Sequence, residues 1–220
     1  MKIHRMVQGS DEWLCARAGI PTASEFSNLV TPAWKARTGE MVETYLSKKL
    51  AERWRGEPLP GWGGGTLEQG SLREEEAIPY FEVQSGLEVE RVGFITTDDG
   101  RWGCSPDGML KGGNGLEVKC PEPHTQIRYL LAGVLPAAYA TQVQGSMLVT
   151  QAQAWTFFSY CRGLPDLILT VSRDEKAIAA LAEALTSFCE RLDEGYARLV
   201  SLYGGPPPTT ADDESGSLGF

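Results

Sequence analysis

Three residues able to bind a divalent metal ion and act on a phosphodiester lie within thirteen positions: Asp107, Glu117 and Lys119. The segment Leu116-Glu-Val-Lys-Cys120 lies between a glycine-rich stretch and Pro121, which predicts a short β-strand. Side chains alternate across a strand, so Glu117 and Lys119 share a face, roughly 6.6 Å apart. There a carboxylate can hold a hard cation, while an ammonium orients water or stabilises charge on phosphate. The spacing therefore favours phosphodiester hydrolysis.

A purely structural explanation competes with this interpretation. Pro106-Asp107-Gly108 is a common turn sequence, because proline presets φ and aspartate hydrogen-bonds its own backbone. Glu-x-Lys on a strand is often only the solvated face of a sheet. A hairpin that returned Asp107 to the start of the Glu117 strand would favour the metal site, and both explanations stay open at this point.

Composition limits the classes of protein. A chain of 220 residues with 42% hydrophobic residues can bury one core, so a single domain is expected. The net charge of −9 argues weakly against nucleic-acid binding, because net charge does not describe how charge is distributed on the surface. The longest apolar runs fall well short of the eighteen or so residues needed to cross a membrane, so we expect a soluble, intracellular protein without a membrane partner.

Cysteine and histidine usage excludes several kinds of site. The chain has five cysteines, an odd number, with no C-x-x-C pair, which favours reduced thiols and argues against a disulfide framework or zinc ribbon. With only two histidines, His4 and His124, most histidine-built metal sites are excluded.

Apolar spacing and turn residues predict a mixed α/β fold. Ser10 caps a first helix that ends by Gly19, and Thr22-Ala-Ser24 opens a second, short helix. A capping box at Ser172-x-x-Glu175 opens the last helix, which Gly204-Gly-Pro-Pro-Pro stops. We expect a single domain over 1–203 and a polar, disordered tail over 204–220. Further helices are expected at 39–54 (apolar at Met41, Tyr45, Leu46, Leu50 and Trp54), 67–83 and 137–149, a loop at 56–65, and strands at 88–96, 101–105, 115–120, 154–160 and 167–171.

Two of these helices carry further candidates. Glu74, on the helix over 67–83, is placed to join Asp107 and Glu117 if it points inward, although a solvated acidic face is the commoner arrangement. Gln142 and Gln144 lie about 200° apart around a helix, so at most one of them faces a common site.

The N-terminal region contains a candidate phosphate pocket. Trp13 and Arg17 are four residues apart and share a helix face, and Thr22 and Ser24 begin the next helix. Helix N-termini have free N–H groups and partial positive charge, so Arg17, Thr22 and Ser24 together would bind phosphate. Without that context, Thr22 and Ser24 are more often simple caps.

These segments, taken in order, resemble the bacteriophage lambda exonuclease and YqaJ-type viral recombinase family. The resemblance covers roughly residues 8–200, and its specificity comes from five motifs in register. They are Gln8-Gly-Ser-Asp-x-Trp13-x-x-x-Arg17-x-Gly19-x-x-Thr22-Ala-Ser24, Gly70-x-x-x-Glu74, Cys104-Ser-Pro-Asp107-Gly, Gly115-Leu-Glu117-Val-Lys119-Cys-Pro and Tyr139-x-x-Gln142-Val-Gln-x-Ser-Met147.

The resemblance implies an α/β restriction-endonuclease-like (PD-(D/E)XK) fold, with a mixed central sheet flanked by helices. It implies a Mg²⁺-dependent enzyme, with Mn²⁺ as a substitute, that digests one strand of linear duplex DNA from its 5′ end to 5′-mononucleotides and leaves 3′ overhangs. Two ions per site would be held by Glu74, Asp107, Glu117 and the Val118 backbone carbonyl. Lys119 would activate water or stabilise the pentavalent phosphate, and Gln142 would support it. Arg17, Ser24 and Ser105 would bind the 5′ phosphate, with Thr22 beside them and Trp13 either near the separating strands or in the core.

Family resemblance also implies a ring-shaped homotrimer around DNA, a single-strand annealing partner, and the cytoplasm of a bacterial host for a phage or prophage product. Three alternatives remain at the level of sequence: a RecB-like or Cas4-like nuclease, a restriction-type endonuclease, and a catalytically silent DNA-end-binding protein. Cas4-like enzymes use four cysteines for an iron–sulfur cluster, whereas Cys161 and Cys189 lie far apart here.

Overall fold

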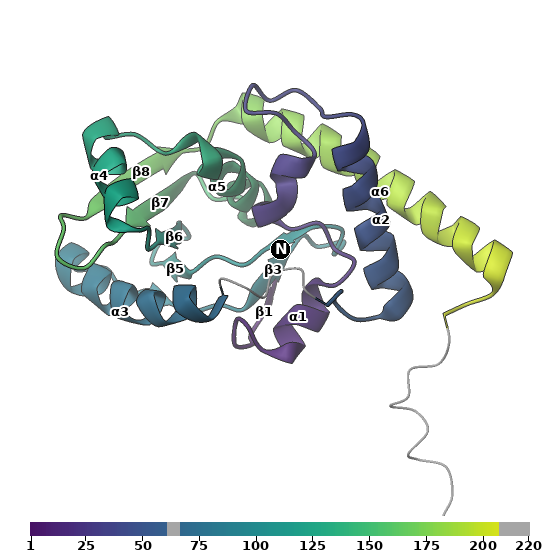
Figure 1. The fold of residues 1–220 in the computed structure, drawn as a ribbon, viewed down its shortest axis with the longest axis horizontal. Coiled ribbons are helices and arrows are strands. Elements are labelled where there is room, and N and C mark those ends of the chain that lie inside the picture. Colours follow the sequence, from purple (N-terminus) through teal and green to yellow (C-terminus); the bar gives the residue numbers. More distant parts are fainter. Residues whose placement is uncertain (61–66, 207–220) are drawn as a thin grey trace, which may run out of the picture.

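The computed structural model describes residues 1–60 and 67–206, with side chains over 1–60 and 76–206. Its strands form two sheets, one of order β1-β3-β4 and one of order β2-β5-β6-β7-β8 (Figure 1). The strands are β1 (Lys2–His4), β2 (Val89–Glu90), β3 (Phe94–Thr96), β4 (Gly103–Cys104), β5 (Gly108–Leu110), β6 (Gly115–Lys119), β7 (Ala154–Ser159) and β8 (Leu167–Ser172). The helices are α1 (Asp11–Arg17), the 3₁₀ helix η1 (Ala23–Asn28), α2 (Glu40–Arg55), α3 (Leu67–Ser85), α4 (Pro123–Ala132), α5 (Ala137–Thr150) and α6 (Glu175–Tyr203).

The five-stranded sheet is mixed. Strands β5 and β6 form an antiparallel hairpin in which Gly108 pairs with Leu116, whereas β6 and β7 run parallel with Glu117 opposite Phe157. A parallel pair needs a long crossover connection, and α4 and α5 provide it. This crossover brings α5 over the strand that carries Glu117 and Lys119.

Each face of β6 has a different partner, as the alternation of its side chains requires. Leu116 and Val118 are fully buried in a cluster with α3 residues such as Phe81. Glu117 and Lys119 lie on the opposite face, toward α5, whose Val143 and Met147 belong to the second and larger core cluster. The sheet is therefore covered on both sides, by α3 and by α5 (Figure 1). The charged pair lies on the α5 side, where Gln142 donates a hydrogen bond to Glu117.

Two glycines permit close approach of these elements. A Cβ on Gly115 would lie 2.1 Å from the ring of Trp155 on β7, and a Cβ on Gly145 of α5 would lie 2.5 Å from Phe26 of η1. Contacts this short do not occur for real Cβ atoms, so any larger residue would displace its neighbour. Gly115 therefore fixes β6 against β7, and Gly145 lets α5 pack directly on η1.

Several expected boundaries differ. The strand expected over 88–96 is interrupted, and its halves, β2 and β3, belong to different sheets. The short helix after Thr22 is a 3₁₀ helix, whose first-turn N–H groups the Thr22 side chain does not cap. Likewise the capping box at Ser172 is wrong, since Ser172 ends β8 and Asp174 accepts the N–H groups of Lys176 and Ala177. Strands β1 and β5 and helix α4 were not expected.

Most other elements are confirmed within a few residues, including the Ser10 cap, which accepts the N–H of Trp13. In α2 the buried residues are Val42, Tyr45, Lys49 and Glu52, whereas Met41 is half exposed, so the expected apolar stripe is only partly correct. Residues 61–65 of the predicted loop and 207–220 of the predicted tail lie outside the described residues. None of the helices in the described ranges is long and apolar enough to cross a membrane.

Candidate active site

The β5–β6 hairpin brings the three opening candidates together. The backbone N–H of Asp107 donates to the Leu116 carbonyl at 3.1 Å, and the N–H of Val118 donates to Asp107 Oδ2 at 2.6 Å. The hairpin expected from the spacing is therefore present. Asp107 sits at the edge of the strand that carries Glu117 and Lys119.

Glu117 is held from two directions. Its side chain is 1% exposed, and its Oε1 lies 2.6 Å from Lys119 Nζ and accepts a 2.6 Å hydrogen bond from Gln142 Nε2. Burial of a carboxylate is costly unless such partners compensate it. Gln144 faces elsewhere and bonds the backbone of Ser172 and Asp174, so only one of the two glutamines points to the site, as helix geometry required.

The Val118 backbone points toward Asp107. In a strand, the N–H and C=O of one residue point to the same edge, as in a pair that exchanges both bonds. The N–H of Val118 bonds Asp107, so its carbonyl faces the same edge, where β5 has begun one residue after Asp107. A backbone oxygen and two carboxylates thus come from adjacent positions of one hairpin.

The ionisable groups perturb one another. Burial raises the pKa of Asp107, although Lys119 and the N–H of Val118 act in the opposite direction. For Lys119, burial disfavours the charged ammonium, but Glu117 and Asp107 outweigh it and raise the pKa. Lys119 also lies 5.3 Å from the ring centroid of Tyr139 on α5. Lys119 is therefore a firmly protonated cation between two acidic groups.

The helix expected to supply the third carboxylate is present. Glu74 lies on α3, but its side chain is outside the described residues, so its role stays a prediction. Two positions along, Glu76 is exposed and accepts a hydrogen bond from the Tyr160 hydroxyl. Over the described side chains, no cluster of three His, Cys, Asp or Glu residues forms a metal site.

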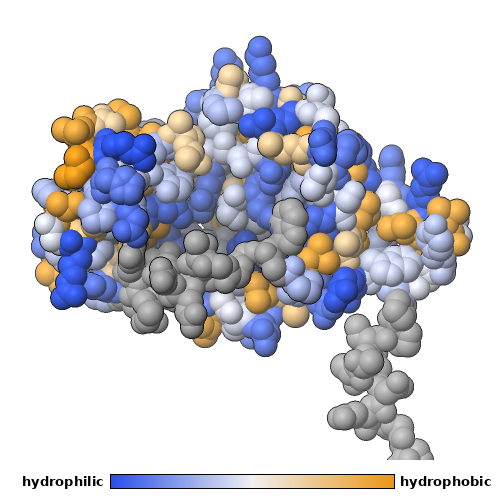
Figure 2. Space-filling model, in the orientation of Figure 1, coloured by the Kyte–Doolittle hydropathy of each residue, from blue (hydrophilic) through white to orange (hydrophobic). Residues whose placement is uncertain are grey.

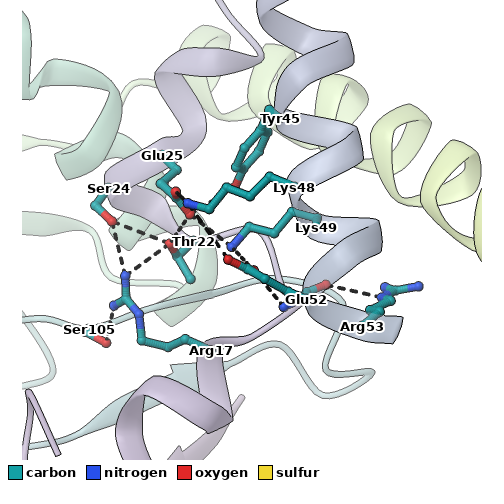
Figure 3. A network of polar contacts seen from close by, with 11 residues as sticks. Arg17, Thr22, Ser24, Glu25, Tyr45, Lys48, Lys49, Glu52, Arg53 and Ser105 are labelled. Carbon is teal, nitrogen blue, oxygen red and sulfur yellow. Dashed lines mark hydrogen bonds and ion pairs between the residues drawn. The ribbon is translucent and has the colours of Figure 1, made fainter. Parts of the chain in front are cut away.

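The candidate phosphate pocket is also assembled. The Arg17 guanidinium donates to Ser105 Oγ at 2.8 Å, to Thr22 Oγ1 at 3.3 Å and to Ser24 Oγ at 3.4 Å (Figure 3). These residues come from α1, from the start of η1 and from the segment after β4. Because η1 is a short 3₁₀ helix, the pocket relies on side chains rather than on the helix N-terminus assumed from the sequence.

Trp13 packs against Arg17 and fixes Ser105. Its ring lies 4.1 Å from the Arg17 guanidinium carbon, and its indole N–H donates to Ser105 Oγ at 3.0 Å and to the Gly93 carbonyl at 3.1 Å. The side chain is only 7% exposed, so it orders Arg17 and leaves little surface for a wedge between strands.

One short segment connects the residues of the β5–β6 hairpin with the candidate phosphate pocket around Arg17. Ser105 and Asp107 are separated by a single proline, and two residues of chain span at most roughly 7 Å. The candidate phosphate pocket therefore lies close to the carboxylates of the hairpin.

A buried charge network beside Arg17 was not expected. Glu25 of η1 lies 2.6 Å from Lys48 Nζ and 3.1 Å from Lys49 Nζ, and Glu52 lies 3.0 Å from Lys49 (Figure 3). Lys49 is 4% exposed and Glu52 accepts the Gly19 N–H at 2.9 Å. Nothing in their spacing singles out these two acids and two lysines, and only the packing of α2 on η1 brings them together.

A cavity of about 280 Å³ opens between Arg17 and this network. Charged side chains make up one part of its wall and apolar ones the other. The residues lining it are Trp13, Leu14, Arg17, Ala18, Ser24, Glu25, Lys48, Lys49, Glu52 and Pro58.

The mixed sheet with acidic residues and a lysine on a β-hairpin defines a nuclease of the restriction-endonuclease-like fold. Known structures agree. An alkaline exonuclease from Laribacter hongkongensis matches with a TM-score of 0.78 and 25% identity over 88% of this chain and 97% of that one, and its complex with dAMP gives 0.77 at the same identity and coverage. A phage-related exonuclease from Haemophilus somnus 129PT, at 13% identity, shares the fold with a TM-score of 0.60 over 82% of this chain and 96% of that one.

Sequence comparison gives the family. Residues 12–153, which span every candidate from Trp13 to Gln142, match the YqaJ-like viral recombinase domain, and the chain belongs to that family. The Escherichia coli (strain K12) protein ExoD is 33% identical over 85 residues, which cover 36% of this chain and 95% of that protein. The chain is thus an exodeoxyribonuclease of the lambda-exonuclease type that acts on DNA.

Proposed function

We propose that the protein is a Mg²⁺-dependent 5′-to-3′ exonuclease that degrades one strand of linear duplex DNA, releases 5′-mononucleotides and leaves 3′ single-stranded overhangs. The observation that carries this proposal is the short segment Ser105-Pro106-Asp107, which joins the Arg17 pocket to the carboxylates of the hairpin. A terminal phosphate bound at Arg17 would place a neighbouring phosphodiester at Asp107 and Glu117. The complex of the Laribacter enzyme with dAMP, a mononucleotide, supports this choice of product.

The donor set fits a hard divalent cation. Asp107 Oδ, Glu117 Oε and the Val118 carbonyl are all oxygen ligands, and Mg²⁺ binds through one or two carboxylates while keeping several waters. Glu74 on α3 is the proposed further ligand, and Mn²⁺ can replace Mg²⁺ in such a set. Two bound ions would supply positive charge that stabilises the attacking and leaving oxygens of an in-line displacement.

The chain's own groups orient the reaction. Lys119, protonated and 2.6 Å from Glu117, donates hydrogen bonds to the attacking water or to the charged phosphate oxygens. Gln142 fixes Glu117 Oε1 and thereby the rotamer on which Lys119 depends. Neither group has to change protonation state to do this.

The pocket around Arg17 accounts for selection of the end. A terminal phosphate monoester has three anionic oxygens, and Arg17 with Ser24, Ser105 and Thr22 offers a charged fork and three hydroxyls. A 5′-hydroxyl end cannot use these donors. We therefore infer a preference for 5′-phosphorylated ends.

The proposal is tested with labelled linear duplexes and a closed circle of the same sequence, with Mg²⁺ or with EDTA. We expect Mg²⁺-dependent release of 5′-mononucleotides from the 5′-phosphorylated strand only, with circles left intact. Digestion of circles would show an endonuclease, and DNA-end binding without loss of label would show a silent binding protein.

We further propose a single nuclease domain over 1–203, a homotrimeric ring around DNA and a phage single-strand annealing protein as partner in a bacterial cytoplasm. These proposals rest on membership of the recombinase family. Light scattering of the purified chain tests the trimer, whose expected mass is three times 24.0 kDa, and removal of residues 204–220 with unchanged exonuclease rate tests the domain boundary.

A further inference from the structure

Glu25 makes an indirect contact with the phosphate pocket through one hydroxyl. The Thr22 hydroxyl lies 3.3 Å from Glu25 Oε2 and 3.3 Å from an Arg17 terminal nitrogen (Figure 3). A hydroxyl has one proton, so when it donates to the carboxylate its lone pairs face the guanidinium. By accepting the Thr22 hydrogen bond, Glu25 thus leaves the oxygen lone pairs of Thr22 to accept a hydrogen bond from Arg17.

The Glu25 carboxylate is itself fixed by three partners. Lys48 and Lys49 lie 2.6 and 3.1 Å from its two oxygens, and the Tyr45 hydroxyl donates to Oε2 at 3.4 Å. Burial disfavours the charged form, but Lys49 and Lys48 outweigh it and lower the pKa to about 2. Glu25 is therefore ionised at neutral pH and cannot rotate without breaking two ion pairs.

Arg17 needs a countercharge of this kind. Burial lowers the pKa of its guanidinium, and Glu25 is the largest of the opposing charges. Its other partners, the hydroxyls of Ser105 and Ser24, are neutral. Without Glu25, the guanidinium would keep its stacking on Trp13 but lose the largest of the charges that oppose the cost of its burial.

We propose that Glu25 is a positioning residue for the terminal phosphate: through Thr22 it orders Arg17, and Lys48 and Lys49 hold it in place. This inference rests on the 5′-phosphate specificity proposed above. Glu52 has a different role: it accepts hydrogen bonds from the Gly19 N–H and from Lys49, and over the described residues none of its hydrogen bonds reaches Arg17.

The test measures end selectivity, which a merely structural residue would not change. Duplexes with a 5′-phosphate or a 5′-hydroxyl are compared for kcat/KM with Mg²⁺ and for Kd by anisotropy with EDTA. For Glu25→Gln we expect the phosphate-to-hydroxyl ratio to fall about ten-fold, mainly through KM, as for loss of one charge-assisted interaction. Glu25→Asp, which keeps the charge, should regain part of the ratio.

Thr22→Val is the second variant, because it removes the linking hydroxyl and leaves every buried ion pair intact. Thr22 also belongs to the pocket itself, so its effect is compared with that of the double variant. If Glu25 acts through Thr22, adding Glu25→Gln to Thr22→Val should lower the ratio no further, and additive losses would contradict the inference. Glu43→Gln, which breaks an exposed ion pair between Glu43 of α2 and Arg191 of α6, is the matched control and should leave the ratio unchanged.

The experiment can contradict the phosphate pocket and the role of Glu25 separately. A wild-type ratio near one would overturn the phosphate pocket and this inference with it. A high wild-type ratio that Arg17→Ala abolishes, but that Glu25→Gln and Thr22→Val both retain, would overturn the inference alone.

Discussion

Two acidic centres lie near Arg17, and the pKa of a carboxylate shifts in opposite directions in the two. At the hairpin, burial raises the pKa of Asp107 despite the nearby Lys119, whereas at η1 two lysines lower the pKa of Glu25 to about 2. Added positive charge would therefore stabilise the ionised form of Asp107, the proposed metal ligand, whereas Lys48 and Lys49 already do so for Glu25. The difference in partners is what separates the role proposed for Asp107 from the positioning role proposed for Glu25.

The largest expected effect concerns the hairpin. Lys119→Ala removes the ammonium 2.6 Å from Glu117 and should lower the Mg²⁺-dependent cleavage rate at least about 100-fold, the usual cost of one donor to developing charge. Binding of DNA ends, measured by anisotropy in EDTA, should persist. Lys176→Ala, on the exposed start of α6, is the control. Full activity of Lys119→Ala would contradict the catalytic role proposed for the hairpin.

The second prediction tests how the ion pairs of Glu25 contribute to stability at different pH values. A depressed folded pKa stabilises the protein above the unfolded pKa of about 4.5, and this contribution disappears as pH falls toward about 2. Glu25→Gln should therefore reduce the free energy of unfolding by up to about 3 kcal/mol at pH 7, and by progressively less below pH 4.5. Urea unfolding of both proteins at several pH values measures it. A difference that does not shrink with acidification would contradict the ion-pair explanation.

The third prediction concerns β6, the strand that carries Glu117 and Lys119. Gly115→Ala places a Cβ 2.1 Å from the Trp155 ring, so β6 must shift, and we expect a loss of about 1–3 kcal/mol in stability. Thermal unfolding measures it. Gly205→Ala, whose Cβ meets no atom within 4 Å, should leave the melting temperature unchanged. Equal effects at both positions would show that general glycine flexibility, not the Trp155 contact, is responsible.

The smallest effect is expected where charges are exposed. Arg191 and Glu43 lie 2.7 Å apart at the surface, and exposed pairs contribute about 0–1 kcal/mol. Arg191→Gln should therefore change the free energy of unfolding far less than Glu25→Gln, measured in the same urea titration. A comparable loss would mean that burial does not distinguish the two kinds of ion pair.

Local pattern was sufficient where neighbours in sequence are neighbours in space. The shared face of Glu117 and Lys119 and the limit of one site-facing residue between Gln142 and Gln144 follow from the two-residue and 3.6-residue periods. The same reasoning failed at 88–96, because a continuous strand pattern does not reveal that β2 and β3 pair with different partners. It also placed the N-cap of α6 at Ser172, two residues early, because Ser172 still pairs with Ala154 in β8.

The sequence by itself determined the chemistry of the hairpin and the kinds of residue available to bind phosphate, since both depend on spacing along short segments. Only the tertiary structure decided that Lys49 and Glu52 are buried, that Trp13 lies beneath Arg17, and that Glu25 reaches Arg17 through Thr22. These contacts join α1, η1 and α2, and their existence depends on how closely the helices pack. No period along the chain encodes that distance, so the second acidic centre became visible only in the fold.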